Sequence, residues 1–407
     1  MTTPPLRRAT AFGPATVFKR AIVIVLDSVG IGELPDAGIY GDVGSDTLGN
    51  IAKCVRLRLP TLRALGLGSI SSIGQGEPGG PSALAPTAIG RMAEASPGKD
   101  SVTGHWEMMG VVLARPFPVF PHGFSTGIIA EFSRLTGRSI LGNRPASGTA
   151  IIDALGAEHM RTGALIVYTS ADSVFQVAAH ESIVPLAELY AACETARAML
   201  VAPHDVSRVI ARPFTGVPGA FHRTANRRDF SLDPPEETLL DALAARGIPR
   251  GGVGKVDDLF AGRNIRTTHT SSNAEGIALI LKWLASDQVG LCFANLVDFD
   301  QLFGHRNDAA GFYAALRELD RALPSIIDAL REDDLLFITA DHGNDPTTPS
   351  TDHARECVPL IVLGTAVRPV SLGVLDTFSD LGATVADWLG ISFRGRGRSF
   401  APAAING

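Results

Sequence analysis

The sequence DLLFITADHGNDPTTPSTDH, residues 334–353, joins a short apolar run to a polar segment that contains possible metal ligands. Residues 335–338 are all apolar and predict a buried strand. Asp341 and His342 follow where this strand ends, and His353 comes after a loop rich in Pro and Thr. An oxygen ligand beside a nitrogen ligand at a strand end predicts a metal site, and the alternative is a polar turn that caps the next helix.

Two further apolar runs end on aspartate in the same way. AIVIVLD, residues 21–27, predicts a strand that is buried on both faces and ends at Asp27. GLCFANLVDFD, residues 290–300, ends at Asp300, and a helix predicted over 309–332 returns the chain to the strand described above. Parallel strands joined by a crossover helix present their carboxyl ends at one edge of the sheet. We therefore expect the three carboxylates to converge in a ligand crevice.

His305 stands five residues after Asp300 and adds a third imidazole to the set. Three aspartates and three histidines are enough ligands for two divalent cations with open positions left over. Carboxylates gathered in a partly dry cleft repel one another and need positive charge. Oxygen and imidazole ligands without thiolate favour Mn²⁺ or Zn²⁺ over Ca²⁺, with Mg²⁺ an option. The alternative is that each residue is separately a helix cap, a loop residue or a core histidine.

SPGKDSVTGHWEMMG, residues 96–110, gathers more reactive side chains than a connecting loop needs. Two metal ions suit phosphoryl transfer, and a hydroxyl between them becomes acidic enough to act as a nucleophile. Ser101 is the candidate nucleophile, and Thr103 is its competitor. The alternative role for Ser101 is an ordinary helix N-cap.

The length of 407 residues exceeds the usual single core and predicts two domains. A repeated strand and helix pattern over residues 116–231 predicts a small α/β cap inserted into a larger α/β core, whose mostly parallel sheet is flanked by helices. Within the cap, SRVIARPF predicts a strand that ends at Arg212. The predicted boundaries are an N-terminal tail at 1–19, core segments at 20–115 and 232–407, and the cap at 116–231.

Composition excludes several classes of protein. Hydrophobic residues make up 45% and charged residues 19%, which favours a large ordered core. A net charge of −6 gives no general attraction to nucleic acid or to anionic membranes. No apolar run approaches the ~18 residues that span a bilayer. The four cysteines are widely spaced without a CxxC motif, which predicts reduced, mostly buried thiols in a cytoplasmic protein.

Six motifs occur in an order that is found in a known family. They are VLDSVGIGELPDA, GSDTLGN, GKDSVTGHWE, YTSADS, NLVDFDQLFGH and ITADHGNDPTTPSTDH. Over residues 20–400 they resemble the motifs of bacterial phosphopentomutases, of the alkaline phosphatase superfamily. The resemblance implies an alkaline-phosphatase-like core with an inserted cap. It also implies interconversion of α-D-ribose 1-phosphate and D-ribose 5-phosphate, and of the 2-deoxyribose analogues, with a bisphosphorylated sugar as activator.

The same resemblance assigns roles to individual residues. It implies that one Mn²⁺ is held by Asp300, His305 and His353, and the other by Asp27, Asp341 and His342. The phosphorylated nucleophile is implied at Ser101, where the family usually has threonine. The implied substrate contacts are Ser170, Asp172, Arg212, Arg223 and Lys255.

Physical chemistry agrees with those substrate contacts, since Arg and Lys supply the cations that a phosphate needs. Isolated surface charges are the alternative. Three other functions stay open on the same residues: a metal-dependent phosphatase, a phosphoglycerate mutase, and a catalytically silent sensor of sugar phosphates.

Overall fold

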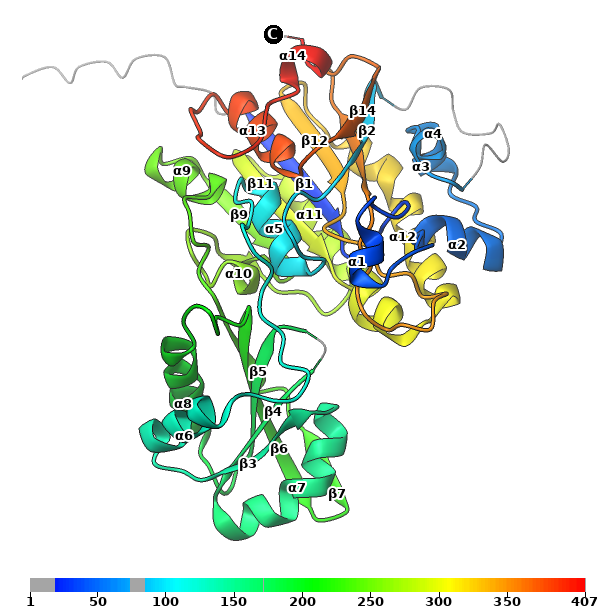
Figure 1. Cartoon of the computed structure of the whole chain (residues 1–407). Coiled ribbons are helices and arrows are strands. Elements are labelled where there is room, and N and C mark those ends of the chain that lie inside the picture. The colour runs from blue at the N-terminus through cyan, green and yellow to red at the C-terminus, as the bar shows by residue number, and fades with distance from the viewer. Residues whose placement is uncertain (1–18, 74–84, 171, 407) are drawn as a thin grey trace, which may run out of the picture.

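The computed structural model describes residues 19–73, 85–170 and 172–406, so the predicted tail falls outside the described residues except for Lys19. The larger of two sheets has the strand order β10-β9-β11-β1-β12-β13-β2-β14 (Figure 1). Among these strands only β13 runs against the others. The strands are β1 (Arg20–Leu26), β2 (Thr87–Met92), β9 (Arg250–Val253), β10 (Thr267–Thr268), β11 (Gly290–Leu296), β12 (Asp334–Thr339), β13 (Val358–Leu363) and β14 (Val370–Leu375). The expected mostly parallel sheet is confirmed.

Strand β1 lies between β11 and β12 and is parallel to both. Leu26 is in register with Leu296 of β11, and Val25 is in register with Thr339 of β12. The predicted crossover from β11 to β12 through α12 (Ala309–Asp328) therefore passes over β1. The three segments that follow these strands all begin at one edge of the sheet.

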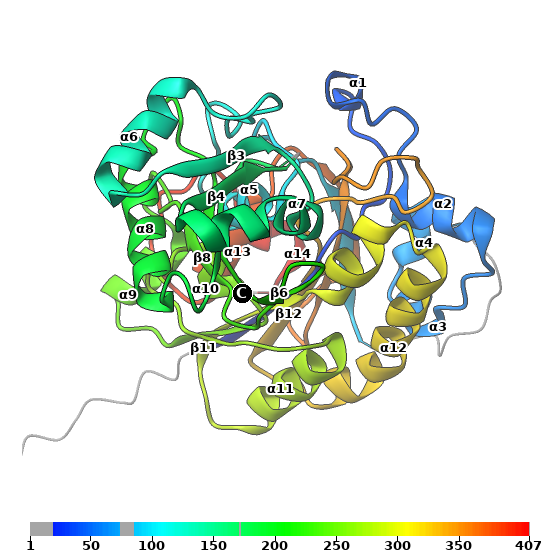
Figure 2. The same ribbon diagram turned by 90° about the horizontal axis from the view of Figure 1, so that it is seen from below.

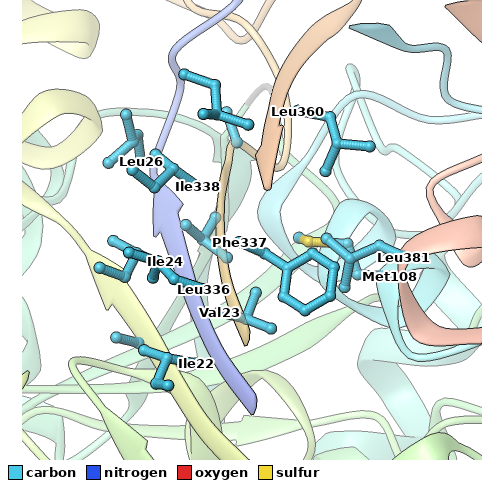
Figure 3. Packing of buried hydrophobic residues seen from close by; sticks show 14 of the residues in the cluster. Ile22, Val23, Ile24, Leu26, Met108, Leu336, Phe337, Ile338, Leu360 and Leu381 are labelled. Carbon is cyan, nitrogen blue, oxygen red and sulfur yellow. The ribbon is translucent and has the colours of Figure 1, made fainter. Parts of the chain in front are cut away.

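Helices cover both faces of this sheet, which explains why residues 21–26 of β1 are all apolar. Figures 1 and 2 show α5 (Ser101–Met108) and α13 (Ser379–Trp388) on one face, and α11 (Asn273–Ala285) and α12 on the other. Side chains alternate between the two faces because successive residues of a strand point in opposite directions. Val23 and Phe337 thus pack beside Met108 of α5 and Leu381 of α13 (Figure 3).

The smaller sheet has the strand order β3-β4-β5-β6-β7, and β8 also pairs with β6. Helices α6 and α8 share one apolar cluster with one of its faces, and α7 shares a second cluster with the other face. All of these elements fall within residues 116–231, while the domain boundaries themselves stay a prediction. The strands and helices of this part are β3 (Ile140–Pro145), β4 (Leu165–Thr169), β5 (Val174–His180), β6 (Arg208–Val217), β7 (Ala220–Arg223), β8 (Arg228–Ser231), α6 (Thr126–Thr136), α7 (Gly148–Thr162) and α8 (Leu186–Met199).

The prediction that the SRVIARPF strand ends at Arg212 is wrong, because β6 continues to Val217. Pro213 does not interrupt the sheet. On one side of β6, β8 pairs with residues 208–211 and β7 pairs with residues 214–217. Pro213 falls between these two partners, where its missing N–H costs no ladder hydrogen bond. Arg212 therefore lies in the interior of a rigid strand.

Two further expectations concern membranes and cysteines. Within the described part of the chain, no helix has both the length and the apolar character that crossing a bilayer requires. The four cysteines are free thiols, three of them buried and Cys54 exposed. The prediction of mostly buried, unbridged thiols is confirmed.

A buried ion pair joins the starts of β1 and β12 and gives a first testable prediction. Arg20 donates from Nε to Asp334 Oδ1 at 2.6 Å and from Nη2 to Oδ2 at 2.5 Å, and the two side chains are 3% and 1% exposed. Arg20→Met leaves a buried carboxylate without its partner. We expect the free energy of unfolding, measured by urea denaturation, to fall by about 3–5 kcal/mol.

The double variant Arg20→Met/Asp334→Asn should recover part of that loss, because its buried amide carries no charge. A loss below about 1 kcal/mol in the single variant would contradict the importance of this pair.

Candidate active site

Carboxylates from three neighbouring strands meet at the edge of the larger sheet. Asp27 directly follows β1, and Asp341 follows β12 after one intervening residue. Asp300 lies in a π-helix, Phe299–Phe303, that begins just after β11. Such π-helical turns are rare and occur often at functional sites. The structure thus brings together the three aspartates that the sequence singled out.

Two compact groups of possible ligands form at this edge. Within each group, one ligand atom per residue lies within 4.8 Å of the others: Asp27 with Asp341 and His342, and Asp300 with His342 and His353. His342 therefore belongs to both groups, whereas the family resemblance assigns it to one. His305 lies outside the second group, although its Nε2 is 3.2 Å from Asp300 Oδ2.

All three imidazoles direct Nε2 toward the aspartates of the site. Nε2 of His305, His342 and His353 lies 3.2–3.7 Å from an aspartate oxygen of the site. Nδ1 of His305 and Nδ1 of His342 face the backbone carbonyls of Thr351 and Gly343, at 2.6 and 3.0 Å. A donor hydrogen bond at Nδ1 leaves the lone pair on Nε2 free for a metal ion.

The electrostatics of the site call for positive charge. Asp27 Oδ1 and Asp341 Oδ2 are buried and have no hydrogen-bond partner among the described residues. Burial and the neighbouring Asp341 charge raise the pKa of Asp27 to about 6. Burial acts to lower the pKa of His342, but Asp341 and Asp27 outweigh it and hold that pKa well above its usual range. Carboxylate oxygens without partners, beside imidazole nitrogens, fit divalent cations.

Asp300 differs from Asp27 in the direction in which its pKa is shifted. Burial acts to raise its pKa, yet the hydrogen bond with His305 and the charge of His353 hold it well below its usual range. Ser28 and Asn344 also donate hydrogen bonds to its Oδ1, at 2.7 and 3.2 Å. Asp300 is therefore held as an anion by its surroundings.

Ser101 is the first residue of α5 and points toward this edge. Its Oγ lies 3.1 Å from His342 Nε2. The alternative that Ser101 is an N-cap is wrong, since Asp100 caps the helix and accepts from the backbone N–H of Val102 and Thr103. The Thr103 hydroxyl is buried and donates to Asp100 at 2.6 Å. Of the two candidates, only the Ser101 hydroxyl therefore faces the ligand groups.

Close packing holds α5 against the aspartates. A Cβ atom at Gly104 would lie 2.2 Å from the carbonyl oxygen of Asp341, so only glycine allows this approach. His105 is fully buried, and its Nδ1 lies 2.9 Å from the carbonyl oxygen of Ser101 and 3.2 Å from Asp341 Oδ2. The motif GKDSVTGHWE thus places a hydroxyl and orients a carboxylate from a single helix.

A cavity of about 700 Å³ opens onto the site, and residues from both sheets line it. Asp341 and His342 lie behind its surface and are buried. The remaining predicted residues all line it: Asp27, Ser101, Ser170, Asp172, Arg212, Arg223, Lys255, Asp300, His305 and His353.

The cavity wall carries more cations than the sequence analysis proposed. Arg208, Arg227, Arg228 and Arg306 also line it. The sequence analysis missed Arg208. The sequence does hold a signal for it, since residues 208, 210 and 212 alternate along one strand and therefore share a face. The structure places all three of these side chains in the cavity.

Burial lowers the pKa of two cations that line the cavity, Arg212 and Lys255. Burial and the nearby Arg227 lower the pKa of Arg212 to about 10. Burial also lowers the pKa of Lys255, an effect that Asp27 and Asp300 oppose. Crowded, partly dehydrated cations of this kind fit an anionic ligand.

Comparison with known proteins places the chain in a superfamily and relates it to phosphopentomutases. The family model of the metalloenzyme superfamily matches residues 19–393. The phosphopentomutase of Carboxydothermus hydrogenoformans is 56% identical over 386 residues, which cover 94% of this chain and 98% of that protein. The phosphopentomutase of Acetivibrio thermocellus is 54% identical over 385 residues, with the same two coverages. The match along nearly the whole chain confirms the predicted α/β metalloenzyme fold.

Solved structures that match most of the chain are more distant in sequence. The PH0037 protein of Pyrococcus horikoshii is 16% identical with a TM-score of 0.49, and the match covers 93% of this chain and 99% of that one. A phosphoglycerate mutase of Leishmania mexicana is 13% identical with a TM-score of 0.47, and the match covers 94% and 97%.

The partnerless carboxylate oxygens lead to a prediction about metal removal. Divalent ions relieve the repulsion between buried carboxylates only in the folded protein. Adding Mn²⁺ to protein freed of metal with a chelator should therefore raise its melting temperature in a thermal-shift assay. An ion at 100 times its Kd adds about 2.7 kcal/mol to the free energy of unfolding.

Asp341→Asn should abolish most of this shift, while Asp287→Asn, at a fully exposed position, should keep it. Identical melting temperatures with and without metal would refute the presence of a metal site.

Proposed function

The chain belongs to the phosphopentomutase family of the metalloenzyme superfamily, and from this premise we propose how its residues interconvert ribose 1-phosphate and ribose 5-phosphate. It is accordingly an isomerase that acts on pentose phosphates and depends on a divalent metal. We further propose that the 2-deoxyribose analogues are substrates and that the enzyme is cytoplasmic. The observation that carries the mechanism is the Ser101 hydroxyl, 3.1 Å from His342 Nε2, beside carboxylate oxygens without partners.

We propose Mn²⁺ as the metal, with Mg²⁺ and Zn²⁺ as alternatives. When bound, the two ions supply positive charge to the phosphoryl oxygens and acidify the nearby hydroxyl. The mixed oxygen and imidazole ligands support this choice. His305 is kept in the set because its Nδ1 is engaged by the Thr351 carbonyl while its Nε2 faces Asp300. The proposed ligands are Asp300, His305 and His353 for one ion, and Asp27, Asp341 and His342 for the other.

Ser101 Oγ carries the phosphoryl group between turnovers in this proposal. The bond from phosphorus to Oγ breaks as phosphorus bonds to the free hydroxyl oxygen of the bound ribose phosphate, and the proton of that hydroxyl is transferred to Oγ. The resulting bisphosphate turns round in the cavity. Its other phosphoryl group then returns to Oγ, and the isomeric monophosphate leaves. A bisphosphorylated sugar from solution activates the enzyme because it loads Ser101 by this same second step.

The opposite wall of the cavity holds the sugar and the phosphate that is not reacting. Arg212 on β6 and Arg223 on β7 provide cations on this wall, and Arg208 is added to them because it lines the same cavity. Lys255, which follows β9 of the larger sheet, provides a further cation from the side of the metal ligands. Ser170 and Asp172 follow β4 and accept hydrogen bonds from ribose hydroxyls. Residues from both sheets surround the substrate, which limits the access of water to phosphorylated Ser101. Free access of water would turn the mutase into a phosphatase.

Substituting the two hydroxyl residues tests the nucleophile. Ser101→Ala should lower kcat for formation of ribose 5-phosphate from ribose 1-phosphate by at least about 10⁴-fold, since it removes the atom that accepts the phosphoryl group. Ser101→Thr should retain measurable turnover. Thr103→Val should keep most activity and lose stability, because its hydroxyl serves the helix cap.

Full turnover in Ser101→Ala would reject the proposed nucleophile. Free phosphate measured in the same reactions separates the other functions. If the wild type released mainly phosphate, it would be a phosphatase, and if it bound ribose 5-phosphate without turnover, it would be a sensor.

Arg212 tests the proposed phosphate contacts. Arg212→Met removes one charged contact to the phosphate and should raise KM for ribose 5-phosphate about 10- to 100-fold, with a smaller change in kcat. Arg134→Met is the matched control, because Arg134 lies exposed on α6 and pairs with Glu131 outside the cavity. Equal KM values in both variants would remove Arg212 from the substrate site.

A further inference from the structure

Ser28 occupies a central position between the two groups of metal ligands. It directly follows Asp27 at the end of β1, and β1 lies between β11 and β12. Ser28 is completely buried, and its φ of 78° is in the left-handed region, which residues other than glycine rarely adopt. Non-glycine residues in such conformations concentrate at functional sites, where the surrounding structure holds them in place.

All three polar groups of Ser28 are used at the site. Its backbone N–H donates to Asp341 Oδ1 at 3.2 Å. Its hydroxyl donates to Asp300 Oδ1 at 2.7 Å. Its carbonyl accepts from the backbone N–H of Asn344 at 3.2 Å, and the side chain of Asn344 donates to the same Asp300 oxygen. One residue thus connects a carboxylate after β11 with a carboxylate after β12.

We propose that Ser28 is a positioning residue that sets the two metal sites relative to each other, with its hydroxyl orienting Asp300. The left-handed backbone turns the N–H toward Asp341 while the side chain reaches the opposite neighbour. The hydroxyl and Asn344 hold Asp300 Oδ1, and Oδ2 faces His305 Nε2. Fixing one carboxylate oxygen by hydrogen bonds orients the rest of the carboxylate toward an ion.

The role of the hydroxyl is separable from that of the backbone. Glycine in place of Ser28 would adopt the same φ without strain and keep the N–H to Asp341, so only the hydrogen bond to Asp300 would be lost. The inference rests on the proposed dinuclear metal site. It predicts weaker metal binding at the Asp300 site in any variant without the hydroxyl, whatever the stability of that variant.

Two variants and a control test this assignment by calorimetric titration of metal-free protein with Mn²⁺. Ser28→Ala and Ser28→Gly both lack the hydroxyl, but Ser28→Gly should melt at a higher temperature because its backbone is unstrained. Both should bind one of two Mn²⁺ ions about 10- to 100-fold more weakly than the wild type, with the other ion within about threefold. Ser379→Ala, which removes another fully buried hydroxyl that donates to a carbonyl, should bind both ions normally.

If the wild type binds two ions and both Ser28 variants bind them with the same affinities, this inference is overturned while the proposed dinuclear site stands. Equal weakening at both sites would also overturn it, because the contact with Asp341 is kept in both variants. Fewer than two ions on the wild type would overturn the proposed dinuclear site and this inference with it.

Discussion

The buried convergence of three aspartates is the constraint on which the rest of the structure depends. Parallel pairing of β1 with both β11 and β12 sends Asp27, Asp300 and Asp341 to one edge of the sheet. Burial there removes the water that would otherwise separate like charges. Asp27 and Asp341 each keep an oxygen without a partner, and three imidazoles face the same space. The arrangement is stable only with positive charge, and this requirement makes it suitable for metal ions.

Packing and hydrogen bonds around the site position the nucleophile and the ligand side chains more precisely than charge attraction alone would. Gly104 allows α5 to approach the backbone of Asp341, and this approach places the Ser101 hydroxyl beside His342. Ser28 donates hydrogen bonds to Asp341 and Asp300 from the end of β1, and His105 on α5 lies 3.2 Å from Asp341 Oδ2. Hydrogen bonds of this kind fix the direction of a ligand oxygen, and a rigid helix or strand fixes the origin of the donor. The nucleophile and the ligands are therefore positioned by one continuous set of contacts.

Charge changes sign across the cavity. One wall presents carboxylates and imidazoles from the larger sheet, and the other presents mainly Arg side chains from β6, β7 and β8. The bisphosphate of the proposed reaction has one anionic group for each wall, provided that divalent ions lie on the acidic one. A chain with a net charge of −6 thus binds anions by local arrangement and not by its overall charge.

Much of this organisation followed from the sequence alone. Apolar runs that end on Asp27, Asp300 and Asp341, two of them joined by a predicted crossover helix, indicated parallel strands. Both signals can be read from short stretches of sequence. The same holds for the choice of Ser101 and of the three histidines as candidates. Local pattern did not indicate the π-helix around Asp300, the sharing of His342 by two groups, the continuation of β6 past Arg212, or the part played by Ser28. Those features rest on contacts between distant segments, such as the Ser28 hydrogen bonds to residues 272 and 313 positions away. The sequence determined which side chains stand at the strand ends, and only the tertiary structure decided which atoms meet there, because their distances depend on how whole strands and helices pack.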